Sequence, residues 1–163
     1  MTKWKNILIG GTLTAGVVSL VSYLTRLKRT SAELESVATA NIHSVKLDGL
    51  TVRIDVQLKN PTSTTLKIKY PFVKVINNKK VIGTSKVIDK DITIPKNGEA
   101  KIAGIMINIP ATGLLSLGSG LLSLLTKKQA VPIVVQTITT IDLGWKKVPY
   151  SKSDDMTLKP KTA

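Results

Sequence analysis

Ten consecutive residues, 50–59, alternate between apolar and polar side chains, and the pattern stops at Asn60-Pro61. Side chains on a β-strand point to opposite faces in turn, so the alternation predicts a strand with one buried and one solvated face. Pro61 has no N–H to donate to a neighbouring strand, and Asn60 can bond its own backbone in an Asx turn. The pair therefore predicts a rigid strand exit, and a ligand contact by Asn60 is the functional alternative. The inward side chains are Leu50, Val52, Ile54, Val56 and Leu58.

Most of the chain after residue 41 has the same extended character. Turn signals such as Asn77-Asn78 and Pro95-Lys96-Asn97-Gly98 recur every eight to twelve residues, which is typical of an antiparallel sandwich. We expect a mainly β fold, a small antiparallel β-sandwich of about seven strands with one helix, over residues 41–163. The expected strands are 42–48, 50–59, 66–76 with an interruption at Pro71, 80–88, 91–94, 100–109, 131–141 and 145–150, with a closing strand at 156–159. Strand 100–109 is expected to be buried on both faces near its end.

One segment, 112–126, instead has leucines at helical spacing. Gly113, Gly118 and Gly120 weaken this helix by roughly 1 kcal/mol each relative to alanine. The helix either caps an open end of the sandwich or packs against a membrane or a partner. The candidate partner-binding residues are Leu114, Leu117, Leu121, Leu124 and Leu125.

The segment 6–25 contains twenty residues without a charge. As a helix it spans about 30 Å, the thickness of the hydrocarbon core of a bilayer. Trp4 and Tyr23 lie near its ends, where aromatic rings favour the interface. The membrane-anchor side chains are Ile7, Leu8, Ile9, Leu13, Val17, Val18, Leu20, Val21 and Leu24, and the basic flanks are Lys3, Lys5, Arg26, Lys28 and Arg29.

We therefore expect a single-pass anchor with basic flanks at residues 1–29 and a short helical linker at 30–40. The linker begins with a capping-box pattern, Thr30-Ser31-Ala32-Glu33. A cleaved signal peptide and a buried soluble helix are the alternatives to an anchor, and small residues at Gly11 and Ala15 would permit close helix packing. Positive charge is nearly equal on both sides, so the orientation, and whether the membrane is a cell envelope or a virion membrane, stay open.

The sequence lacks the residue patterns of known catalytic sites. With no cysteine, disulfides, cysteine-ligated zinc and thiol catalysis are excluded. His43 is the sole histidine, and the sequence contains no Gly-x-Ser-x-Gly nucleophile elbow. Asp89 and Asp91 could bind a cation, but nearby lysines favour a solvated charged turn, and Asp154-Asp155 is expected in a loop. We predict that the protein is not an enzyme and that it binds no cofactor, metal or small-molecule substrate.

The net charge of +14 comes from 24 basic and 10 acidic residues. Nearly all the basic residues are lysines, which suit diffuse attraction to an anionic surface more than base reading. With six aromatic residues in the chain, stacking platforms for single-stranded nucleic acid are poor, although backbone attraction stays possible. The basic residues on expected strands are Lys46, Arg53, Lys59, Lys67, Lys69, Lys74, Lys79 and Lys80.

The ordered motifs of residues 42–158 resemble the late-embryogenesis-abundant type 2 family, also called the water-stress and hypersensitive-response domain. The resemblance rests on Leu58-Lys-Asn-Pro61, on Asn77-Asn-Lys-Lys-Val-Ile-Gly83 and on the final pair, 131–137 and 148–151. It implies a small antiparallel sandwich with one helix, often behind a membrane anchor, and it carries no catalytic residues. The three glycines of the helix and the basic surface depart from the family pattern.

These features predict a non-enzymatic, membrane-anchored structural or docking protein. It would hold a basic sandwich beside a bilayer and bind a protein partner or another copy of itself within a larger assembly, of which a membrane-containing virion is one example. The alternatives are a cell-envelope stress protein that binds lipid or another apolar ligand, and a basic nucleic-acid-binding protein at a membrane.

Overall fold

The computed structural model describes residues 34–115 and 130–159. These residues are nearly all β-structure, in antiparallel pairs, with one short helix. None of the helices in this part of the chain is long and apolar enough to cross a membrane. The predicted anchor and its flanks, residues 1–29, lie outside the described residues, as do Leu117, Leu121, Leu124 and Leu125 of the predicted partner helix.

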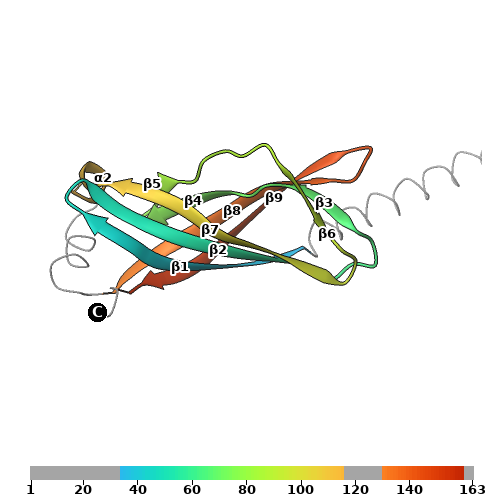
Figure 1. Cartoon of the computed structure of the whole chain (residues 1–163), viewed down its shortest axis with the longest axis horizontal. Helices are drawn as coiled ribbons and strands as arrows, with labels where there is room; N and C mark the ends of the chain where they lie inside the picture. Colours follow the sequence, from blue (N-terminus) through green and yellow to red (C-terminus); the bar gives the residue numbers. More distant parts are fainter. Residues whose placement is uncertain (1–33, 116–129, 160–163) are drawn as a thin grey trace, which may run out of the picture. The chain divides into compact units, whose positions relative to one another are not determined.

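The first sheet has three strands in the order β1-β2-β7, all antiparallel (Figure 1). Its strands are β1 (Glu35–Lys46), β2 (Gly49–Asn60) and β7 (Gly98–Pro110). Strand β2 lies in the middle, and its five predicted inward side chains are at most 1% exposed. The alternation of residues 50–59 is therefore confirmed.

The second sheet is built around β8, which pairs with β9 along one side and with β4 and β3 in succession along the other. Strand β5 pairs with β4, and β6 pairs with β3. The strands are β3 (Leu66–Lys69), β4 (Phe72–Asn77), β5 (Lys80–Thr84), β6 (Asp91–Ile94), β8 (Val131–Asp142) and β9 (Lys147–Leu158). The two sheets face each other across an aliphatic core, with β1 beside β9 and β7 beside β5 and β6.

The described part of the chain has nine strands, where about seven were expected. Pro71 splits the expected strand 66–76 into β3 and β4, because proline cannot donate to the ladder. The Asn78 and Lys79 turn joins β4 to β5 with positive φ at both residues, as a two-residue hairpin requires.

The helix predicted for residues 30–40 is wrong over its described part, because β1 already begins at Glu35. Leu34, Ser36 and Ala38 are buried in alternation, and Ser36 and Ala38 pair with Leu58 and Val56 of β2. This cross-strand pairing outweighs the local helix signal, since propensity is weak against tertiary contacts. The sandwich therefore includes residues from 34 onward and does not start at 41.

The expected loop at Asp154-Asp155 is also wrong. Both residues belong to β9, where they pair with Val135 and Val134 of β8. Strand β9 has no apolar alternation strong enough to be recognised, but β8 provides a partner along its whole length. The two strands expected at 145–150 and 156–159 are thus parts of one strand.

Strand β7 was expected to be buried on both faces near its end, but only one face is buried there. Gly104, at φ 76°, forms a bulge opposite Asp55, and this extra residue shifts the alternation so that Ile102 and Ile105 both point inward. The outer positions Met106 and Asn108 are exposed.

The helix α2 (Ala111–Leu115) follows β7 directly. The backbone N–H of Ala111 donates to the carbonyl of Asp48 at 2.9 Å, so the helix starts against the β1–β2 hairpin. Leu114 is 2% exposed and belongs to the core. The buried position of Leu114 fits a helix that caps an open end of the sandwich, the first of the two predicted roles.

Candidate functional site

The end of the sandwich where the chain enters at Leu34 concentrates several features, and we call it the entry end (Figure 1, right). It comprises the start of β1, the connection 61–65, the turn Pro95–Gly98 and the β8–β9 hairpin. The opposite end carries the β1–β2 and β4–β5 hairpins and α2.

The start of β1 is fixed between the two sheets. Leu34 is 3% exposed and Ser36 is fully buried. Tyr150 donates its hydroxyl to Oγ of Ser36 at 3.3 Å, and Lys152 donates Nζ to the Ser36 carbonyl. These bonds join β1 of the first sheet to β9 of the second.

The β9 side of this junction has a polar interior. Lys152 also lies 3.5 Å from Oδ1 of Asp154. Within residues 34–115 and 130–159, Oδ2 of Asp154 and Oγ1 of the fully buried Thr137 have no hydrogen-bond partner. Sequence reasoning missed this group because β9 was divided and its middle taken as a loop.

The β8–β9 hairpin presents an aromatic and basic tip. Oδ1 of Asp142 accepts the N–H of Gly144 at 2.8 Å, and Gly144 has φ 86°. The next residue, Trp145, is 53% exposed, and it is followed by the exposed Lys146 and Lys147. A tryptophan beside lysines is the pairing found at membrane–water interfaces. The Trp145-Lys146-Lys147 sequence carries this signal, but sequence reasoning applied the interface pattern only to Trp4 and Tyr23 beside the predicted anchor.

Two further lysines, Lys59 and Lys96, lie at the entry end. In the part of the chain that the structure describes, no ion pair joins Lys59, Lys96, Lys146 or Lys147 to a carboxylate. Glu35, Asp142 and Glu99 lie at the same end and reduce its net positive charge.

The other predicted basic residues do not form one patch. Lys46, Lys79 and Lys80 lie at the opposite end of the sandwich, and Lys74 lies 6.0 Å from the ring centre of Phe72. Arg53 lies on the outer face of the first sheet and pairs with Asp55 at 3.1 Å. Among the described residues, these basic side chains are therefore divided between the ends and faces of the sandwich.

Asp89 and Asp91 bind lysines of this chain. Lys69 lies 2.8 Å from Asp89 and 2.9 Å from Asp91, and Lys67 lies 3.0 Å from Asp91. The hydrogen bond to Asp89 raises the pKa of Lys69, and the hydrogen bond from Lys69 lowers the pKa of Asp91. Ammonium groups thus take the place that a cation would need. Among the described residues, no three potential metal ligands are grouped.

Asn60 uses its side chain within the fold. It is 1% exposed, and Nδ2 donates to the carbonyls of Thr64 at 2.8 Å, Pro95 at 2.9 Å and Ile94 at 3.3 Å. Its Oδ1 accepts the N–H of Thr62 at 3.1 Å, which is the predicted Asx turn. The arrangement favours the structural interpretation of Asn60 over a ligand contact.

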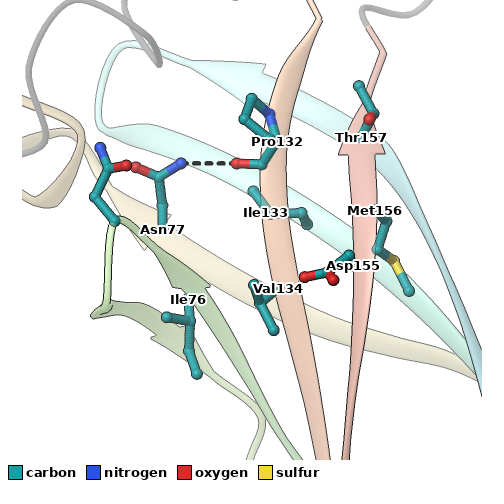
Figure 2. Close-up of a pocket in the computed structure, with 9 residues that line it drawn as sticks. Ile76, Asn77, Pro132, Ile133, Val134, Asp155, Met156 and Thr157 are labelled. Atoms are coloured by element: carbon teal, nitrogen blue, oxygen red, sulfur yellow. Dashed lines mark hydrogen bonds between the residues drawn. The ribbon is translucent and has the colours of Figure 1, made fainter.

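A hollow of about 350 Å³ lies at the far end, between β4, β8 and β9 (Figure 2). Asn77 donates Nδ2 to the Pro132 carbonyl at 2.8 Å on one side, and Asp155 lies on the other. The lining combines one carboxylate with amide, hydroxyl and aliphatic groups, which is no recognisable set of acid, base and nucleophile. His43 lies elsewhere, on a bulge in β1 between Ile42 and Ser44, and is exposed.

Comparison with known proteins identifies a fold and no family. No family model matches the chain, and no curated protein matches it. A crystal structure of a protein from Archaeoglobus fulgidus is 11% identical, with 80% of this chain and 99% of that one covered and a TM-score of 0.51. A solution structure of a protein from Arabidopsis thaliana is 17% identical, with 77% and 80% covered and a TM-score of 0.52. A candidate late embryogenesis abundant protein is 16% identical over 92% and 90%, but at a TM-score of 0.37 it carries no argument.

Proposed function

We propose that this chain is a non-enzymatic docking protein, tethered to a bilayer by residues 1–29, whose sandwich rests on lipid headgroups through its entry end. The uncharged run 6–25 has the length and flanks of a single-pass anchor. Chain connectivity brings Leu34 within a few residues of that anchor.

One observation carries the proposal: the exposed Trp145, Lys146 and Lys147 lie at the same end of the sandwich as Leu34. The tryptophan ring suits the headgroup layer, and each lysine near an anionic surface contributes about 1 kcal/mol of attraction. The buried start of β1 suits a tether, because it is held by both sheets.

We also propose, as a finer statement, that the sandwich is a type 2 late-embryogenesis-abundant domain. The motif order and the Asx turn at Asn60 support it. The virion setting, the binding of an apolar ligand and the binding of nucleic acid stay predictions without a supporting contact among the described residues.

The test uses the full chain with Trp4→Phe, which leaves Trp145 as the single tryptophan. The protein is reconstituted into phosphatidylcholine vesicles with or without phosphatidylglycerol, and with a nitroxide quencher on the headgroups. We expect quenching of Trp145 that increases with the anionic lipid. Lys146→Gln with Lys147→Gln should reduce it, whereas Lys79→Gln with Lys80→Gln, a lysine pair at the far end, should not. Unquenched Trp145 in anionic vesicles would refute the lipid contact.

The tether is tested separately by alkaline carbonate extraction of membranes that contain the full chain. The unmodified chain should stay with the membrane pellet, and Val17→Lys should release it, because a charge at the centre of a span costs about 3 kcal/mol. Release of the unmodified chain would contradict the anchor.

A further inference from the structure

The free edges of the two sheets differ in how well they resist pairing with another strand. An unpaired edge is a template for a further chain, and proteins usually protect it with charges, proline, bulges or short length. Among the described residues, the edge strands are β1 and β7 of the first sheet, and β9, β5 and β6 of the second.

Four of these five strands are protected. Strands β5 and β6 have five and four residues, β9 carries Pro149 and Asp155, and β7 is interrupted by the bulge at Gly104. Strand β1 also has a bulge, at His43, and Lys152 of β9 donates to its Ser36 carbonyl, but β1 combines a length of twelve residues with the absence of proline. From Ser36 to Val45 it has no Lys, Arg, Asp or Glu.

Strand β1 is also complementary to a second copy of itself. Its outer-face residues are those that pair with Lys59, Gln57, Asp55, Arg53, Thr51 and Gly49 of β2, namely Glu35, Val37, Thr39, Asn41, Ser44 and Lys46. In a regular strand, Glu35 and Lys46 are separated by an odd number of steps, so their side chains would lie on opposite faces. Two copies of such a strand could not pair antiparallel with Glu35 opposite Lys46. The bulge removes one step, so both charged residues lie on the outer face, at opposite ends of the strand.

We infer that β1 is the pairing strand of a homodimer, in an antiparallel register centred on Ala40. In this register Ala40 faces Ala40 of the second copy, Thr39 faces Asn41, Val37 faces Ser44 and Glu35 faces Lys46. The two side chains of each pair lie on the same face of the sheet, the inner face for Ala40 and the outer face for the other three pairs. The two-fold axis gives two opposite-charge pairs, which favour this register over others. The first sheets of the two copies then form one continuous sheet of six strands.

The antiparallel register also fixes where the two entry ends lie. Leu34 of one copy comes beside the Lys46 end of the other, so the entry ends point away from each other. Twelve residues of strand span about 40 Å. If the entry end rests on lipid, a step that depends on the proposed function, the two copies come from two bilayers that face each other, and the dimer holds them together.

The dimer is tested in mild detergent, where the result does not depend on lipid contact. Because the chain has no cysteine, introduced thiols report single positions. A mixture of full-chain Val37→Cys and Ser44→Cys should form a disulfide-linked dimer on mild oxidation, and each variant alone should not. Val81→Cys mixed with Thr84→Cys, on the exposed side of β5, is the matched control. Equal cross-linking in single variants or control, or none in the mixture, would overturn the register.

A charge exchange tests the same register without a covalent bond. Glu35 and Lys46 are both exposed, so changing them leaves the core intact. Glu35→Lys should weaken dimerisation about tenfold by analytical ultracentrifugation, and adding Lys46→Glu should restore it. A full chain that stays monomeric would overturn the proposal.

The apposition of two bilayers is tested by light scattering of vesicles that carry the full chain. We expect the unmodified protein to cluster the vesicles, Glu35→Lys to prevent clustering and the double variant to recover it. Cross-linking in detergent without clustering would overturn the two-bilayer arrangement and leave the pairing register intact. Failure of Trp145 quenching, by contrast, would refute the lipid contact alone.

Discussion

Asn60 joins three separate segments through one amide. Its donors reach the connection after β2 and the end of β6, and its acceptor shapes the turn that contains Pro61. These are links between the two sheets, because β2 belongs to the first and β6 to the second. At Asp55, a single carboxylate likewise holds the bulge of β7, since it accepts the N–H of Gly104 at 2.7 Å.

Replacing Asn60 should be costly even when the shape is kept. Asn60→Asp places a carboxylate against the three carbonyls that now receive Nδ2, and we expect a loss of roughly 3 to 5 kcal/mol of unfolding free energy at pH 7. Burial against carbonyls raises the pKa of the new carboxyl above its ordinary value near 4, so the loss should shrink as the pH falls from 7 toward about 4, where the carboxyl takes up a proton and can donate again. Denaturation followed by circular dichroism measures both. Asn41→Asp, on an exposed position of β1, is the control, and an equal loss in the two variants would contradict this role.

Asp55 should give the protein a specific sensitivity to acid. The N–H of Gly104 holds the pKa of Asp55 below its ordinary value, with a further contribution from Arg53. Because the pKa of Asp55 is lower in the folded state than in the unfolded state, its ionised carboxylate stabilises the fold at pH values above the unfolded pKa near 4. This stabilisation is lost as the pH falls through the folded pKa. Since the pair is partly exposed, we expect Asp55→Asn to cost about 1 kcal/mol or less at pH 7, and progressively less as the pH falls below about 4. A loss that stays constant with pH would exclude this cause.

At the scale of elements, pairing partners decided what local sequence left ambiguous. Residues 35–40 and 151–155 carry weak strand signals, yet both lie in twelve-residue strands because β2 and β8 offer complete ladders. The environment of helix α2 is likewise set by its tertiary contacts. Leu114 of this helix is buried in the core.

Leu114→Ala should therefore destabilise the sandwich by about 2 to 5 kcal/mol, as expected for a buried leucine replaced by alanine. Leu47→Ala, at a fully exposed leucine of the β1–β2 hairpin, should change stability by less than about 0.5 kcal/mol. Thermal unfolding of the full chain in mild detergent compares the two. If Leu114→Ala left stability unchanged and abolished binding of a partner, the core assignment would fail.

At the scale of the molecule, the excess of positive charge is spread over both ends and both sheets. A dispersed charge attracts an anionic surface without specifying a site, and the entry end is distinguished by Trp145 and by the position of Leu34. Raising the ionic strength from 0.1 to 1 M shortens the Debye length from about 10 to about 3 Å. Headgroup quenching of Trp145 should fall over this range, while resistance to carbonate extraction should persist. Quenching that does not respond to salt would indicate a contact that is not electrostatic.

The sequence by itself determined the mainly β class, the inward face of β2, the Asx turn and the hairpin at Asn78, because each depends on side-chain alternation or local turn chemistry. Only the tertiary structure decided where β1 starts, that β9 is one continuous strand, the bulge at Gly104, the ion pairs of Asp89 and Asp91, and the position of Trp145 at the entry end. These depend on which strands lie beside one another, and the periodicity of a single segment holds no information about its neighbour.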